Sequence, residues 1–61
     1  MNDDKIIILI VDNHPQVLSF LSEIITFQGY KTKQADSGKS ALNYVIENHT
    51  DLILMDVKMP D

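Results

Sequence analysis

Two uninterrupted runs of apolar residues mark the hydropathy pattern of this chain. The first covers residues 6–11 and contains only Ile, Leu and Val, and the second covers residues 52–55. Neither run alternates with polar residues, so a strand formed by either run would be apolar on both faces. Strands of that kind are typical of parallel sheets whose two faces are covered by helices. The pattern therefore predicts two strands of a covered parallel sheet.

Two amphipathic segments between these runs have the spacing of helices. The first begins at Pro15, which suits a first helical turn because its missing N–H is not needed there. It stops before Gly29, which suits a left-handed helix end. The second follows a turn at residues 36–38, where Asp36 or Ser37 can cap a helix. The expected buried faces consist of Val17, Leu18, Leu21, Ile24 and Ile25 in the first helix and Ala41, Leu42, Val45 and Ile46 in the second.

Residues 30–35 separate the two predicted helices and have the composition of a more polar strand. They mix Tyr, Lys, Thr and Gln, which suits a short strand at the edge of a sheet. The order strand, helix, strand, helix, strand is typical of an α/β fold with right-handed crossovers. We therefore expect three layers, with a parallel sheet in the strand order 2-1-3.

Composition and charge narrow the class of protein. The chain has 61 residues, no Cys and a net charge of -4, which fits one small domain without disulfides. Its lysines are scattered, so we expect neither nucleic acid nor an anionic membrane surface as a partner. The longest apolar run, residues 6–11, is far shorter than the roughly 20 residues of a membrane span. We therefore expect a cytoplasmic domain.

Three polar residues at predicted strand ends form a candidate site. Asp12 and Asn13 follow the first apolar run, and Asp56 follows the last one. Because ligands bind at the carboxyl ends of parallel strands, these side chains are expected to converge at one edge of the sheet. Their oxygens suit Mg²⁺, and an Asp beside bound Mg²⁺ can attack phosphorus. The alternative is that Asp12 and Asn13 only cap a helix and that Asp56 only ends a strand.

Other ionisable residues carry weaker signals. His14 has no second His or Cys nearby, so a solvated loop residue is favoured over a metal ligand. His49 falls in a loop at the opposite, amino-terminal edge of the predicted sheet. There a solvated loop residue is favoured even more strongly over a metal ligand. Lys58 could contact a phosphate, but an isolated loop lysine is usually only solvated.

The chain resembles the receiver domain of bacterial two-component response regulators. The matching stretches are residues 8–13, 29–30, 35–42 and 51–60. The last is the most specific, because it combines an apolar strand with an Asp and, after two further residues, Met-Pro. The resemblance implies a flavodoxin-like, receiver-type fold in which the chain is a phosphoacceptor.

The resemblance also assigns roles to individual residues. It implies that Asp56 accepts a phosphoryl group from a histidine kinase or a phosphotransfer protein. It implies Mg²⁺ ligands at Asp12, Asn13, Asp56 and the backbone carbonyl of Lys58. Asn13 stands where the family usually has a second carboxylate, so the expected metal site has one negative charge fewer.

Length is the other departure from the family pattern, and it leaves the function open. Residues 1–61 are expected to be one partial receiver domain, the amino-terminal half, without the switch Ser or Thr and the phosphate-binding Lys. The leading function is a phosphoacceptor signalling module that is not an enzyme. The alternative is a catalytically impaired fragment that acts in interaction or assembly. A phosphotransferase or hydrolase with an Asp nucleophile is disfavoured, because Lys58 occupies the place of its second Asp.

The strand expected at residues 52–55 would present an apolar edge without a neighbour. Such an edge favours pairing with another chain. A two-fold axis beside it would join two copies in a sheet of order 2-1-3-3-1-2. We therefore expect a homodimer through the exposed edge of the third strand, with binding of the missing half or aggregation as the alternatives.

Overall fold

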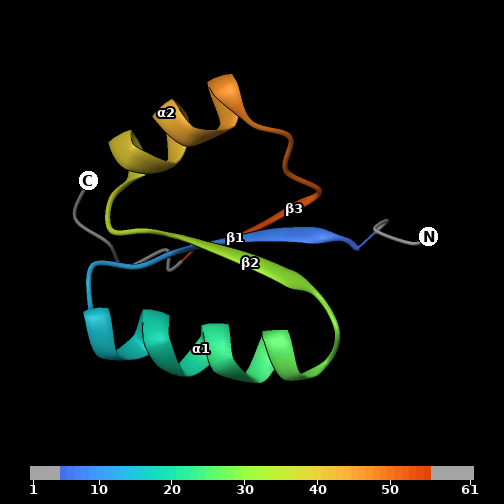
Figure 1. Ribbon diagram of the computed structural model, residues 1–61. Coiled ribbons are helices and arrows are strands. Elements are labelled where there is room, and N and C mark those ends of the chain that lie inside the picture. The colour runs from blue at the N-terminus through green and yellow to red at the C-terminus, as the bar shows by residue number, and fades with distance from the viewer. Residues whose placement is uncertain (1–4, 56–61) are drawn as a thin grey trace.

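The computed structural model describes residues 5–55, which form three strands and two helices (Figure 1). The elements are β1 (Ile7–Val11), α1 (Pro15–Phe27), β2 (Lys31–Ala35), α2 (Gly38–Glu47) and β3 (Leu52–Met55). β1 lies between β2 and β3 and pairs with both in parallel. The α/β fold and the strand order 2-1-3 expected from the sequence are therefore confirmed.

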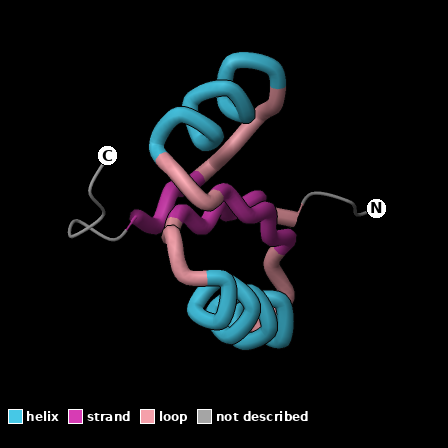
Figure 2. Tube along the Cα trace, turned by 90° about the vertical axis from the view of Figure 1, so that its left-hand side faces the viewer, coloured by secondary structure: helices cyan, strands magenta, loops and turns pink. Residues whose placement is uncertain are grey.

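The two helices cover opposite faces of the sheet (Figure 2). On one face, Ile8 and Ile10 of β1 form a buried cluster with Leu18 of α1. The buried cluster on the other face consists of Leu9, Val11, Ala35 and Ala41. Because successive side chains of a strand point to opposite faces, the uninterrupted apolar run of β1 supplies both clusters. β1 is therefore the centre of the core.

α1 ends in a Schellman motif, as the glycine after it predicts. The N–H of Gly29 donates to the carbonyl of Thr26 at 2.9 Å, and the N–H of Tyr30 donates to the carbonyl of Ile25 at 3.4 Å. Gly29 has a φ of 102°, which a residue without a Cβ adopts at little cost. Because the N–H of Tyr30 serves the helix end, β2 begins at Lys31, one residue later than expected.

The two helices begin differently. Ser37 caps α2, since its Oγ accepts a hydrogen bond from the N–H of Ser40 at 3.1 Å. α1 begins at Pro15, with His14 at the N-cap position and no side-chain cap bond. Neither described helix is long and apolar enough to cross a membrane.

β3 is an apolar strand that stays exposed at one edge of the sheet. It continues the parallel pairing from Ile8 with Leu52 to Val11 with Met55. Both helices pack over β1 and β2, so the side chains of β3 stay uncovered among residues 5–55. Leu54 is 38% exposed and Met55 is 51% exposed. The apolar run of β1 is therefore buried, whereas the apolar run of β3 is exposed.

Candidate functional site

Asp12 is a buried acid at the carboxyl end of β1. Its residue surface is 5% exposed. Its N–H donates to the carbonyl of Ala35 at 3.0 Å, which extends the pairing of β1 and β2 by one residue. This bond fixes the main chain of Asp12, so the carboxylate is held at the edge of the sheet where the sequence predicts the site.

His14 binds the Asp12 carboxylate twice through the same oxygen. The main-chain N–H of His14 donates to Oδ1 at 2.9 Å, and Nδ1 of its ring lies 2.9 Å from Oδ1. These hydrogen bonds, the ring contact first, lower the pKa of Asp12 below its usual value against the opposing effect of burial. The Asp12 side chain is therefore an ionised acceptor at neutral pH.

The contact between Asp12 and His14 was missed by the sequence interpretation, which treated His14 as solvated. The ring is 65% exposed, so the interpretation of a solvated residue holds, and the structure adds a hydrogen bond to Asp12. The sequence does carry a signal for this contact. An Asp side chain often accepts a hydrogen bond from the backbone N–H two residues later, and that residue is His14.

The remaining predicted site residues lie around the same edge. Asn13 is exposed directly after Asp12. Val11 pairs with Met55, so β1 and β3 end side by side. Asp56 and Lys58 lie outside the described residues. The part of the chain that is described therefore brings together Asp12, Asn13 and His14, but holds no group of three His, Cys, Asp or Glu side chains able to bind a metal.

A cavity of about 290 Å³ opens beside Asp12 on the α1 side of the sheet. Its lining consists of Ile10, Val11, Asp12, Leu21, Leu54 and Met55. The carboxylate is the ionisable group in an otherwise apolar lining. One wall of this candidate site is therefore the exposed apolar surface between α1 and β3.

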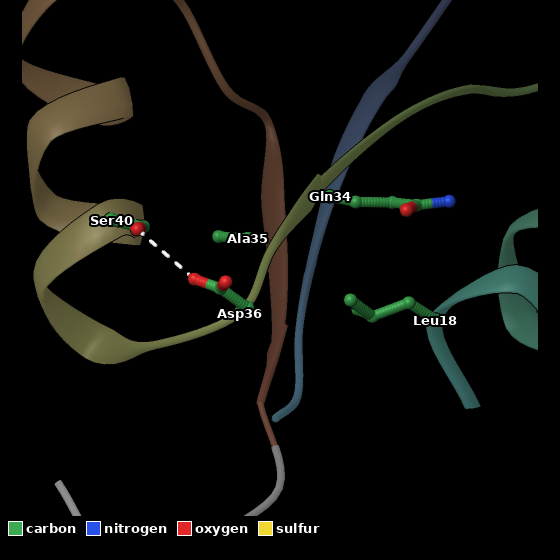
Figure 3. A pocket seen from close by; sticks show the side chains of 5 residues that line it. All are labelled: Leu18, Gln34, Ala35, Asp36 and Ser40. Atoms are coloured by element: carbon green, nitrogen blue, oxygen red, sulfur yellow. Dashed lines mark hydrogen bonds between the residues drawn. The ribbon is translucent and has the colours of Figure 1, made fainter. Parts of the chain in front are cut away.

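A second acid, Asp36, follows β2 at the same edge of the sheet. Figure 3 shows its side chain turned toward Ser40 at the start of α2, and the Ser40 hydroxyl donates to Oδ1 at 3.2 Å. A cavity of about 290 Å³ lies here, lined by Leu18, Gln34, Ala35, Asp36 and Ser40. The Asp36 carboxylate is therefore bonded to α2, whereas the Asp12 carboxylate is bonded to His14.

The opposite edge of the sheet carries a pair of the same residue types. Nε2 of His49 lies 2.8 Å from Oδ1 of Asp51, and Oδ2 of Asp51 accepts the N–H of Ile7 at 2.8 Å. The prediction that His49 lies at the amino end of the sheet is thus confirmed. Here the carboxylate joins the starts of two strands, which is a structural role.

Comparison with known proteins decides the family. The model of the response regulator receiver domain matches residues 8–61. The chain belongs to the receiver domain family. The receiver chain is 40% identical over 60 residues to the sensor histidine kinase RcsC of Escherichia coli K12, which covers 98% of this chain and 6% of that protein. It is 41% identical over 54 residues to the regulatory protein AtoC of the same organism, covering 88% of this chain and 12% of AtoC.

A shorter relative is the sporulation initiation phosphotransferase F of Bacillus subtilis. The identity is 42% over 53 residues, which covers 87% of this chain and 43% of that protein. The receiver chain therefore spans less than half the length of each of these relatives. No solved structure is significantly similar to it.

Proposed function

We propose that this chain is the phosphoacceptor part of a two-component receiver and takes a phosphoryl group from a histidine kinase or a phosphotransfer protein on Asp56. The observation that carries the proposal is the buried carboxylate of Asp12, held at the carboxyl end of β1. β3 ends beside it in register, and Asp56 is the next residue of the sequence. Family membership supports the same role.

In the proposed reaction, a carboxylate oxygen of Asp56 forms a bond to phosphorus. The N–P bond of the donor phosphohistidine breaks, and the imidazole leaves after taking a proton from water. The transfer yields an acyl phosphate on the protein and releases no small-molecule product. The chain would therefore act as a signalling module rather than as an enzyme. We propose the cytoplasm as its location.

The residues at this edge fit a divalent cation. Asp12 supplies a buried, ionised carboxylate and Asn13 an exposed amide oxygen, which are ligands that Mg²⁺ accepts. We propose that Asp56 and the backbone carbonyl of Lys58 complete the site. Bound Mg²⁺ would neutralise charge on the transferring phosphoryl group. Asp12 would anchor the cation. The neutral Asn13 would bind the cation more weakly than a second carboxylate at that position would.

Intact mass spectrometry after treatment with acetyl phosphate and Mg²⁺ tests the proposal. We expect the gain of one phosphate, and its loss in Asp56→Asn. Asp36→Asn is the matched control, because Asp36 follows a strand at the same edge but is bonded to Ser40. Phosphorylation that persists in Asp56→Asn and disappears in Asp36→Asn would overturn the assignment.

A second candidate function is assembly through β3, favoured by the exposure of all four of its side chains. Two copies related by a two-fold axis would pair their β3 strands and bury apolar surface on both. Sedimentation equilibrium would then report a dimer that Ile53→Lys dissociates, while Leu42→Lys on α2 leaves it intact. A folded monomer at micromolar concentration would contradict assembly through this edge.

A further inference from the structure

We propose that the free edge of β2 binds an extended acidic segment of another polypeptide, which joins the sheet as a further strand. Among the described residues β2 pairs with β1 on one side only, so its other edge is open. The inference is carried by the outward main chain of Thr32 and Gln34 and by the lysines on either side of Thr32. It does not depend on Asp56 or on a metal ion.

The main-chain groups of Thr32 and Gln34 point away from β1. The N–H of Lys31 donates to the carbonyl of Ile6 at 2.9 Å, and the carbonyl of Ala35 accepts the N–H of the residue after β1 at 3.0 Å. The first and last residues of β2 thus turn their main chain toward β1. Because this direction alternates along a strand, Thr32 and Gln34 each present one donor and one acceptor at the open edge.

The side chain of Thr32 holds this part of β2 against α1. Oγ of Ser22 lies 2.8 Å from Oγ1 of Thr32, and Oγ1 of Thr26 lies 3.1 Å from the same atom. These hydroxyl contacts do not engage the main chain of Thr32. An edge that is already held as a strand loses less conformational freedom when a partner strand pairs with it.

Two exposed lysines make this edge positive in a chain whose net charge is -4. Lys31 and Lys33 lie on the same face of β2 as Ala35, which belongs to the buried cluster beneath α2. The ion pairs in the described part of the chain are both between His and Asp, so neither lysine is paired with a carboxylate there. A partner strand with Glu or Asp at alternate positions would place these carboxylates beside the two lysines.

The same lysines decide between the possible occupants of the edge. Two copies of β2 paired edge to edge would bring Lys31 and Lys33 of both copies together, and like charges on neighbouring strands are destabilising. A nucleic acid has no strand main chain to pair with Thr32 and Gln34. An extended acidic segment satisfies both the open main chain and the charge, so it is the occupant that fits.

An NMR titration of the labelled protein with a capped peptide of about eight alternating Glu and Val residues tests the inference. We expect the largest shifts at the amides of Thr32 and Gln34, and weaker binding as the salt concentration rises. A matched peptide of alternating Lys and Val should not bind. The Glu peptide methylated on its amide nitrogens keeps its charge but cannot donate to the edge, so its dissociation constant should rise at least about tenfold.

Charge reversal in the protein provides the second arm of the test. The double variant Lys31→Glu with Lys33→Glu should weaken binding of the Glu peptide at least about tenfold and should bind the Lys peptide instead. Lys39→Glu is the matched control, because Lys39 is exposed on α2 and away from the β2 main chain, and it should change the constant less than about twofold. Equal binding of the two peptides, shifts centred on β3, or full affinity of the methylated peptide would overturn the inference.

Discussion

The Asp51 carboxylate accepts a hydrogen bond from the main-chain N–H of Ile7 at 2.8 Å, across 44 positions of sequence. The N–H of Asp51 in turn donates to the carbonyl of Ile7 at 2.9 Å. These bonds close the amino end of the β1 and β3 pair. They hold in register the two strands whose other ends form the candidate site.

Asp51 should make stability depend on pH in the acid range. Its pKa is lowered from 3.8, first by the N–H of Ile7 and then by His49. The contribution is therefore present above about pH 3.8 and is lost as the pH falls through the lower pKa of the folded chain. Urea unfolding at several pH values should show a weaker acid dependence in Asp51→Asn than in the wild type. Glu23→Gln, on the exposed side of α1, should keep the wild-type dependence.

Asn13→Asp should tighten Mg²⁺ binding, because it adds a negative charge at a position that contacts the proposed cation. We expect about a tenfold lower dissociation constant by calorimetric titration. Asn43→Asp adds the same charge on the exposed surface of α2 and should change the constant little. Equal effects of the two substitutions would mean that long-range charge, not contact at position 13, controls the affinity.

Leu9→Ala should be among the most destabilising single changes in the described part of the chain. Leu9 is fully buried in the centre of β1, and removing a large buried side chain typically costs about 2–5 kcal/mol. Leu42→Ala is the control, because Leu42 is 59% exposed on α2. Circular dichroism during urea unfolding should show a large loss for the first variant and little change for the second.

Gly29→Ala should lower stability by about 1 kcal/mol, because an L-residue is strained at positive φ. The added Cβ would meet no atom within 4 Å, so the cost would come from the backbone rather than from a clash. Gly38→Ala is the comparison, since the other described glycine, Gly38, does not have a positive φ. Equal loss in both variants, measured by thermal unfolding, would contradict this origin.

The sequence determined the order, type and direction of the elements. The unbroken apolar run of β1 required cover on both faces, and α1 and α2 provide it. Gly29 and Ser37 marked helix ends, because helix termination and capping depend on neighbouring residues. Asp12 and Asn13 could be assigned to the carboxyl edge because parallel connectivity fixes where strand ends lie.

The tertiary structure decided the polar partners that local sequence patterns do not specify. The bond of Asp51 to Ile7 depends on the register of strands that are distant in sequence, which local patterns do not encode. The hydrogen bond between Asp36 and Ser40 depends on how α2 leaves the sheet. His14 is close to Asp12 in sequence, yet its contact requires a carboxylate already fixed at the end of a buried strand. The hydrophobic pattern predicted the burial of β1, whereas the exposure of β3 and of Leu42 and Ile46 on α2 depends on what packs against them in the fold.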